Sequence, residues 1–205
     1  MIAGGPSVND YPRREIETLC KYGFVFAVIK SVFDFPCDVI VALDFIFITN
    51  NIERLKKLNK PIITRQWENF EQFGLDLTMI PQEFIYTYPN SGMLACKLSD
   101  AMSRVVGKKS YVLGMDNTGG HYYDNGKAPE NGYDGINGQK VVNSYENLKL
   151  NDTINLSVRS KISCWPKQSK LPVIKKILVH TPYRGIGASW IKTYANRIVK
   201  DMPLT

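Results

Sequence analysis

The sequence predicts an α/β fold with a mostly parallel sheet and helices on both faces. Runs of β-branched and aromatic residues recur along the chain, as in strands that are buried on both faces of a parallel sheet. Segments with apolar residues three and four positions apart alternate with these runs, which favours helices between the strands. The chain has 205 residues, of which 44% are hydrophobic, and this suits one globular domain with a real core.

The chain opens with a short apolar segment that runs into Gly4, Gly5, Pro6 and Ser7. This order is typical of a first strand, a turn that approaches phosphate, and a first helix. Glycines lack a Cβ atom, so their N–H groups can come close to a ligand, and a serine hydroxyl can bind an anion or cap the helix. An ordinary strand-to-helix turn has the same composition, and both interpretations stay open. Because the strand is so short, we expect it to be weakly anchored.

The remaining elements follow from periodicity and from the breakers between them. The predicted strands are 24–29, 38–44, 61–64, 84–88 (or a lid segment), 110–114, 153–157 and 174–180, with shorter strand and loop pieces at 161–165. The predicted helices are 13–21, 50–58, 67–73, 93–106 (opened by 90–92), 139–150 and 189–199.

Two aspartates, Asp44 and Asp116, come at the ends of predicted strands. Open α/β sheets bind ligands at the carboxyl edge, where both side chains are expected. Carboxylates there can share a divalent ion, so the sequence predicts Mg²⁺ or Mn²⁺ as a candidate cofactor, with Asp44 and Asp116 as ligands. Formation of a turn at the strand end accounts for either aspartate equally well.

A polar loop over 118–138 contains six glycines together with His121, Tyr122, Tyr123 and Tyr133. Loops of this length without their own structure are usually functional or disordered, and aromatic residues among glycines favour function. His121 is the candidate base, although a packing or hydrogen-bonding role fits a lone histidine as well.

The net charge of +7 is unevenly distributed. No Asp or Glu occurs between Thr153 and Lys200. The same stretch contains ten cationic residues: Arg159, Lys161, Lys167, Lys170, Lys175, Lys176, Arg184, Lys192, Arg197 and Lys200. This pattern indicates an anionic partner for the basic C-terminal region, such as nucleotide phosphates, an acidic glycan, nucleic acid or an acidic protein, or else a solvated face with no partner.

The four cysteines are widely spaced and form no C-x-x-C motif, and the two histidines are far apart. A structural zinc site is therefore not expected. We expect a cytoplasmic protein whose thiols are reduced. No apolar run approaches the roughly 20 residues that span a bilayer, and the start lacks the pattern of a secretion signal.

Several short motifs together resemble a known group of proteins. The segment Ile2-Ala3-Gly4-Gly5-Pro6-Ser7 is similar to the G-x-G-P-S start of the bacterial lipooligosaccharide sialyltransferases and of the Rossmann-like family of archaeal 6-hydroxymethylpterin diphosphokinase, which has many short phage-encoded relatives. Ser91-Gly92 is similar to their S-G helix start. Leu113-Gly114-Met115-Asp116 and the aromatic loop after it resemble their G-h-D strand end, and Asn155-Leu156-Ser157 resembles the N-L-S of the diphosphokinase-like members.

The resemblance covers 1–168 and implies a Rossmann-like nucleotide-binding domain there. The basic segment 169–205 has no counterpart, and we expect it to be a strand-helix extension packed on the same domain. The resemblance implies a nucleotide or nucleotide sugar as ligand and a phage protein acting in the host cytoplasm. Carried over, it points to Gly4, Gly5, Ser7, Ser91, Gly92, Asp116 and Tyr122 as nucleotide-site residues. Asp44 joins the binding candidates as a strand-end aspartate, and Asp116 and His121 are the candidate catalytic residues.

The chain departs from the sialyltransferases at three functional positions. Gly4 stands at the asparagine position of their G-x-G motif. Ile29 ends the second strand, where they have a nucleotide-binding asparagine, and 125–160 contain no counterpart of their catalytic histidine. Two hypotheses follow. The chain is a transferase that moves a glycosyl or diphosphoryl group, or it is a catalytically inactive binding module that contacts nucleic acid or a host factor through its basic C-terminal region. A phage accessory protein that binds a host protein or metabolite is a third.

Overall fold

The structure is a computed structural model that describes residues 1–67, 70–80, 90–105, 107–117, 121–124 and 136–173. Its α-helices are α1 (Arg13–Tyr22), α2 (Phe45–Asn50), α3 (Ile52–Leu58), α5 (Ser91–Val105) and α6 (Ile136–Glu146). Its strands are β1 (Phe26–Val28), β2 (Val39–Val41), β3 (Ile62–Arg65), β4 (Leu77–Ile80), β5 (Ser110–Val112) and β6 (Thr153–Asn155). Short 3-10 helices are η1 (Pro6–Asp10), η2 (Ile29–Phe33), η3 (Phe70–Phe73) and η4 (Tyr122–Asp124).

Every strand pairing in the described part of the chain is parallel. β1, β2, β3 and β4 follow one another in a four-stranded sheet, and β5 pairs with β6. Ile2 joins the two groups, because it forms parallel bridges to Ala27 in β1 and to Leu113 just after β5. The order across the molecule is therefore β4-β3-β2-β1, the Ile2 segment, β5 and β6.

The Ile2 segment lies in the middle of this arrangement and is well anchored, so the expectation of a weakly held first strand is wrong. The Ile2 N–H donates to Phe26 O over 2.9 Å, and the Ala3 N–H donates to Leu113 O over 2.8 Å. The chain builds β1 to β4 on one side of this segment and then returns through α5 to build β5 on the other. The reversal creates a topological switch point at the carboxyl ends of the Ile2 segment and β5, where open α/β sheets bind ligands.

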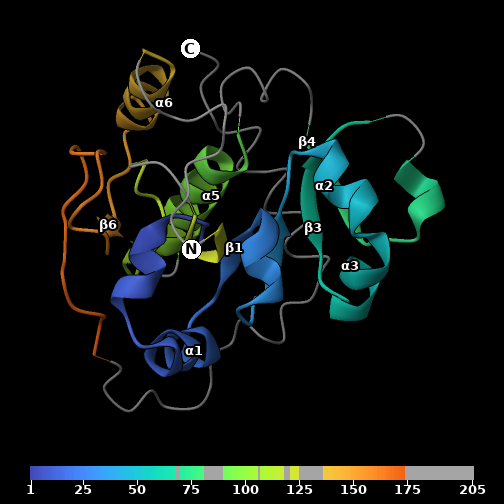
Figure 1. The fold of residues 1–205 in the computed structure, drawn as a ribbon, viewed down its shortest axis with the longest axis horizontal. Helices are drawn as coiled ribbons and strands as arrows, with labels where there is room; N and C mark the ends of the chain where they lie inside the picture. The colour runs from blue at the N-terminus through green and yellow to red at the C-terminus, as the bar shows by residue number, and fades with distance from the viewer. Residues whose placement is uncertain (68–69, 81–89, 106, 118–120, 125–135, 174–205) are drawn as a thin grey trace.

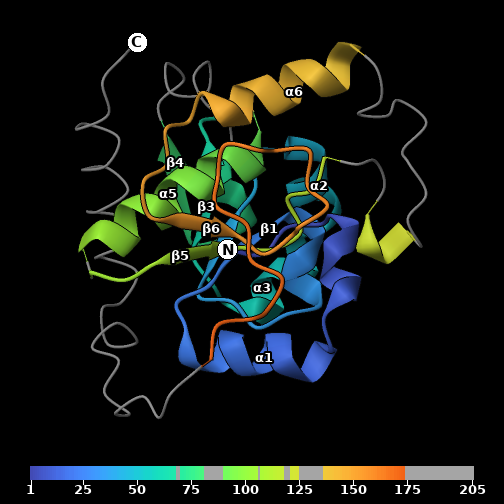
Figure 2. The same ribbon diagram turned by 90° about the vertical axis from the view of Figure 1, so that its left-hand side faces the viewer.

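Two hydrophobic cores cover the two faces of the sheet, which confirms the predicted α/β fold with helices on both sides. Phe26 and Val28 face a core that includes residues of α5 and α6, whereas Ala27 between them faces a core formed with α1, α2 and α3. Side chains alternate between the faces of a strand, so continuous apolar runs serve both cores. Figures 1 and 2 show α1 and α6 at opposite ends of the molecule.

The differences from the predicted elements are local. Residues 45–50 form α2, although Phe45-Ile46-Phe47-Ile48 is rich in residues that favour strands; Asp44 begins this helix by accepting the Phe47 N–H at 3.2 Å. The strand β4 was not predicted, and the described part of the predicted helix 67–73 contains η3 in place of an α-helix. The predicted elements 84–88, 174–180 and 189–199, and most of the loop 118–138, lie outside the described residues, as does most of the predicted extension 169–205.

Candidate functional site

The opening turn, the start of α5 and the loop after β5 converge at the switch point. They surround a crevice of about 130 Å³ at the carboxyl edge. Its walls are formed by Ala3, Gly4, Gly5, Val28, Ile29, Asn90, Ser91, Gly92, Gly114, Met115, Asp116, Asn117, His121, Tyr123, Val141 and Tyr145. The structure thus brings together six of the predicted site residues: Gly4, Gly5, Ser91, Gly92, Asp116 and His121. Ser7 lies directly behind them, bonded to Asp116.

Hydrogen bonds lock the opening turn against the end of β5. The Ser7 N–H donates to Asp116 Oδ2 over 2.6 Å, and the Gly5 N–H donates to Gly114 O over 2.7 Å. The Gly114 N–H in turn donates to the Ser7 hydroxyl over 3.3 Å. Ser7 is 3% exposed and does not line the crevice, so it supports the opening turn from behind.

Two glycines permit this close approach. A Cβ atom on Gly5 would lie 2.5 Å from Gly114 O and 2.6 Å from Asp116 Oδ2. Gly114 has a φ of +78°, and a Cβ atom there would collide with Ala3 O. Residues other than glycine rarely adopt this conformation. Gly114 is a site residue that the assignment by resemblance did not include, although it lies within the quoted motif.

Asp116 and Asn117 each have one buried polar atom with no hydrogen-bond partner among the described residues. Asp116 is only 2% exposed, and its second oxygen, Oδ1, accepts no hydrogen bond within the described residues. The Asn117 side-chain nitrogen is likewise buried and unpaired there, and Asn117 has a φ of +50°. Buried polar groups are costly unless they are paired. A hydroxyl group satisfies both atoms at once, since it donates to a carboxylate and accepts from an amide.

The start of α5 forms the opposite wall. Asn90 caps the helix by accepting the Met93 N–H at 2.9 Å, and the Tyr145 hydroxyl donates to the same oxygen over 2.7 Å. Ser91 and Gly92 are the first two residues of α5, and N–H groups at this position have no partner inside a helix. A 15-residue helix thus directs its positive end toward the crevice.

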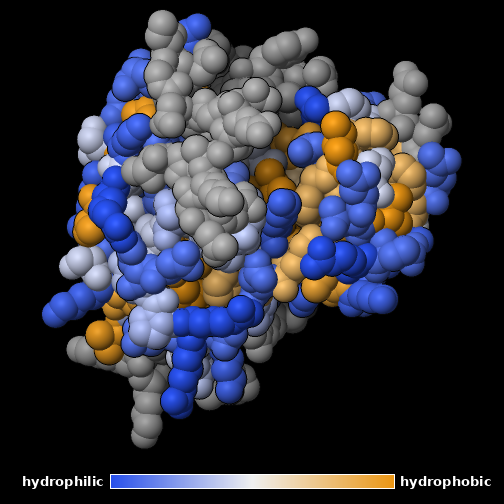
Figure 3. Space-filling view, in the orientation of Figure 1, coloured by the Kyte–Doolittle hydropathy of each residue, from blue (hydrophilic) through white to orange (hydrophobic). Residues whose placement is uncertain are grey.

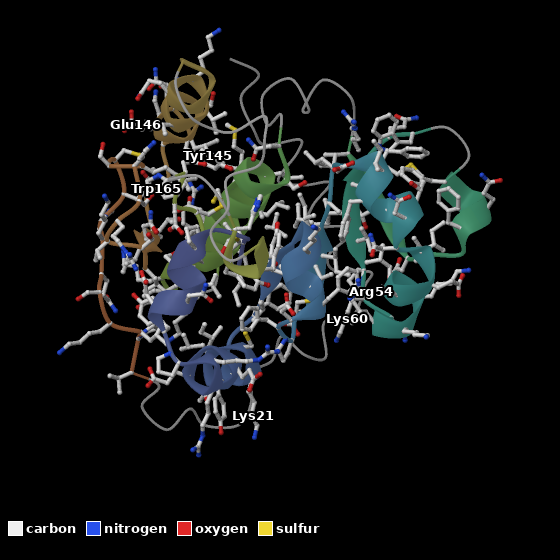
Figure 4. The ribbon with its side chains drawn as sticks, viewed as in Figure 1. Lys21, Arg54, Lys60, Tyr145, Glu146 and Trp165 are labelled. Atoms are coloured by element: carbon white, nitrogen blue, oxygen red, sulfur yellow. The ribbon has the colours of Figure 1, made fainter. Side chains whose placement is uncertain are left out.

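Ser91 and Gly92 also have structural tasks. The Ser91 hydroxyl accepts the Leu43 N–H at 2.8 Å, which ties α5 to the end of β2. A Cβ atom on Gly92 would lie 2.5 Å from the Tyr145 hydroxyl, so the glycine makes room for this side chain. Tyr145 is 3% exposed, lies edge-on to Trp165 at 6.0 Å, and comes from α6 (Figure 4). Neither Asn90 nor Tyr145 was among the predicted site residues.

A stack of aromatic rings forms the outer rim. His121 and Tyr123 lie parallel, with ring centroids 4.8 Å apart. A Cβ atom on Gly4 would lie 2.9 Å from both side chains. The absence of a side chain at Gly4 therefore lets the two stacked rings lie against the opening turn. The Lys30 ammonium lies 4.9 Å from the centroid of the Tyr123 ring, a cation–π contact.

Tyr122 points away from the crevice, and its assignment to ligand binding has no support in this geometry. Its hydroxyl donates to Asp34 Oδ2 over 2.6 Å, and its ring packs on Phe35 at 5.9 Å. Burial and the bond to Asp34 raise the pKa of Tyr122 far above its usual value. Tyr123, the next residue, faces the crevice instead.

Asp44 does not join Asp116. Its carboxylate caps α2, and β1 and the Ile2 segment lie between β2 and β5. Three strand spacings separate the two strand ends by roughly 14 Å. A single ion cannot bridge carboxylates at that separation, so the hypothesis that Asp44 and Asp116 share a metal loses its geometric basis. Within the described residues, no three His, Cys, Asp or Glu side chains gather as a metal site.

Ile29 borders the crevice in a strained conformation. Its φ is +51°, a region that β-branched residues rarely enter. The buried Ser31 hydroxyl holds the turn, because it accepts the Val28 N–H at 3.0 Å and lies 2.8 Å from Val28 O. Asparagine tolerates the left-handed region better than a β-branched residue does.

The loop after β6 supports the end of β5. Asn155 accepts the Ser157 N–H at 3.0 Å, which makes the turn of the Asn155-Leu156-Ser157 motif. The Ser160 hydroxyl then donates to Met115 O over 2.8 Å, and the Lys161 N–H donates to Asp116 O over 2.9 Å. The motif therefore supports the crevice wall from behind.

A larger cavity of about 610 Å³ lies at the opposite, amino edge of the sheet. Apolar residues dominate its walls, and Val173, the last described residue, is one of them. Figure 3 also shows hydrophobic residues over α2, where Ile46 is 66% exposed. The described walls of the larger cavity hold no buried unpaired polar atom, whereas the crevice holds two at the switch point, so the crevice is the candidate site. Four such atoms also lie near α2, in or next to β3 and β4: Thr64 Oγ1, Arg65 Nε, Trp67 Nε1 and Thr78 Oγ1.

Comparisons of the chain with protein-family models, curated proteins and solved structures find no match. Within the described residues, no helix is both long and apolar enough to cross a membrane.

Proposed function

We propose that this chain binds a nucleoside monophosphate unit, free or within a nucleotide sugar, in the crevice at the switch point. The observation that carries the proposal is the pairing of two features across one crevice. The positive end of α5 lies on one wall, and the unpaired Asp116 oxygen with the unpaired Asn117 nitrogen lies on the other.

Each part of such a ligand has a matching group. The phosphate accepts hydrogen bonds from the backbone N–H groups of Ser91 and Gly92. A ribose hydroxyl donates a hydrogen bond to the Asp116 carboxylate and accepts one from the Asn117 side-chain amide. The base extends outward past the rim formed by His121 and Tyr123. The crevice is smaller than most ligand pockets, which span about 300–1,000 Å³, so it encloses only the sugar and phosphate.

A monophosphate fits this environment better than a triphosphate. Asp116 is the one carboxylate in the described lining, and that lining contains no Lys or Arg. The end of a helix offsets only about half a unit charge. A chain of three phosphates beside a buried carboxylate would need more cations than these walls supply.

His121 is the candidate base for a transfer reaction. In that reaction the acceptor hydroxyl gives its proton to His121, and its oxygen attacks the anomeric carbon of the nucleotide sugar. The bond from that carbon to the phosphate oxygen breaks, and the nucleoside monophosphate leaves with the electron pair. This role rests on the position of His121 at the crevice rim and on the resemblance to transferases.

Calorimetry with CMP, AMP, CTP and ATP, each with and without Mg²⁺ or Mn²⁺, tests the binding. The proposal expects a monophosphate to bind at least tenfold tighter than its triphosphate in the absence of metal. It also expects removal of the 2′-hydroxyl to weaken binding. No heat at millimolar concentration with any of the four nucleotides would end the proposal.

A second candidate function is a binding module for nucleic acid. Four exposed cations, Arg159, Lys161, Lys167 and Lys170, follow β6 in the described chain. Trp165 is no stacking platform, because it is 2% exposed and packs beside Tyr145. Filter binding of single-stranded DNA and RNA across a salt series tests this candidate, since phosphate contacts require affinity that falls steeply with salt. A flat or absent signal removes it.

A further inference from the structure

We infer that Lys30 is the residue that pairs with the ligand phosphate at the mouth of the crevice. This inference deepens the proposed function and rests on it. Lys30 follows Ile29, which forms part of the wall, and its side chain is exposed. Its ammonium lies over Tyr123, a second wall residue, at 4.9 Å from the ring centroid.

The position of Lys30 is held from two directions. The backbone before it is fixed by the Ser31 hydroxyl, which bonds within the turn and lies 3.1 Å from Ile2 O. The side chain is held by the face of Tyr123, which itself stacks on His121. A lysine side chain usually loses considerable rotamer freedom on binding, and this arrangement lowers that cost.

The negative charge at the crevice favours a nearby cation such as the Lys30 ammonium. No carboxylate pairs with Lys30 in the described chain, and Asp116 adds negative charge to the lining. A phosphate bound at the start of α5 brings further negative charge. The Lys30 ammonium at the mouth offsets that charge when the phosphate is bound. While the crevice is empty, water solvates the ammonium, so it does not require a carboxylate as an ion-pair partner.

The test compares Lys30→Gln with wild-type protein for two pairs of probes: CMP with cytidine, and AMP with adenosine. Lys30→Gln is expected to weaken binding of the nucleotide about threefold to fivefold at low salt, as for one exposed ion pair, and to leave nucleoside binding unchanged. The difference should shrink as salt rises, because screening weakens exposed pairs. Lys30→Arg keeps both the charge and the ring contact and should bind within about twofold of wild type.

Lys57→Gln is the matched control, since Lys57 is an exposed lysine on α3 outside the crevice. Thermal melts confirm that all variants fold. If wild type binds CMP or AMP and Lys30→Gln binds it equally well, the inference about Lys30 is wrong and the proposed function stands. A loss that is the same for nucleotide and nucleoside also overturns it, because phosphate pairing cannot act on a nucleoside. If wild type binds neither nucleotide, both the inference about Lys30 and the proposed function are wrong.

Discussion

Ser7 and Asp116 are joined by a hydrogen bond of 2.6 Å across 109 positions of sequence. The donor is the backbone N–H of Ser7, so the bond fixes the main chain of the opening turn to a side chain beyond β5. It uses one oxygen of Asp116 and leaves the other buried beside the crevice. One carboxyl group therefore closes the switch point and keeps one oxygen for which the described residues supply no hydrogen bond.

Replacement of Asp116 by asparagine should affect both roles. An amide oxygen can still accept the Ser7 N–H, but the bond is no longer charge-assisted, so we expect a loss of about 1–2 kcal/mol in the free energy of unfolding. Urea unfolding at neutral pH measures it. Asp44→Asn is the control, because asparagine caps a helix as well as aspartate does. Equal stability of Asp116→Asn and wild type would show that the bond does not clamp the turn.

Replacing each of three glycines with alanine should separate the loss of stability caused by steric collision from the loss caused by backbone strain. Gly107 has a φ of +61° and open space around it, so Gly107→Ala should cost only about 1 kcal/mol of strain. Gly5→Ala collides with the carbonyl of Gly114 and should cost about 2–3 kcal/mol. Gly114→Ala suffers both effects and should be the least stable of the three. Thermal denaturation ranks them, and a Gly5→Ala protein as stable as Gly107→Ala would contradict the packing described here.

Asparagine should be unusually well tolerated at Ile29. The change relieves about 1–2 kcal/mol of left-handed strain, which offsets the loss of a half-buried apolar side chain. We expect stability within about 1 kcal/mol of wild type. Leu75→Asn, at a half-buried loop residue without positive φ, should cost more. Chemical denaturation compares them, and equal losses at the two positions would argue against strain at Ile29.

Buried thiols should make the protein less stable in alkaline solution. Burial raises the pKa of Cys20 to about 11 and that of Cys37 to about 12, from an ordinary value of 9.0. The folded state keeps these protons longer than the unfolded state. Their contribution to stability is therefore complete below pH 9 and is lost as the pH rises toward 11 or 12. Unfolding curves between pH 8 and 11 should show this decline, and replacing both cysteines with alanine should flatten it.

Alkylation tests the same burial near neutral pH. The exposed Cys164 should react first with iodoacetamide, while Cys20, Cys37 and Cys96 stay protected until the protein unfolds. Mass spectrometry after a short pulse should find one modified residue. Equal labelling of Cys96 and Cys164 in native protein would be incompatible with the core described here.

Strong local patterns made most of the fold predictable. The apolar runs around Val28 and Val41 and the helix from Ser91 are confirmed, because burial on both faces and amphipathic spacing leave clear signals. α2 was missed because its first four residues, Phe45 to Ile48, are continuously apolar and show no helical period. Its helical state depends on the cap at Asp44 and on packing against other parts of the chain. β4 was missed because its four residues are too few to show a period.

The site was predictable down to its segments but not to every side chain. The motifs located the turn, the start of α5 and the end of β5, since strand ends meet at one edge. Which of two adjacent tyrosines faces the crevice depends on Asp34, 88 positions from Tyr122, and sequence spacing does not reveal that contact. The positions of Tyr145 and Lys30 near the crevice likewise depend on tertiary packing, which the sequence does not show.

A crystal structure of the protein soaked with CMP or AMP tests the central claim most directly. The account predicts density for a phosphate at the N–H groups of Ser91 and Gly92, and for a ribose hydroxyl between Asp116 Oδ1 and the Asn117 amide. Nucleotide bound elsewhere on the molecule, or an empty crevice after a millimolar soak, would contradict it.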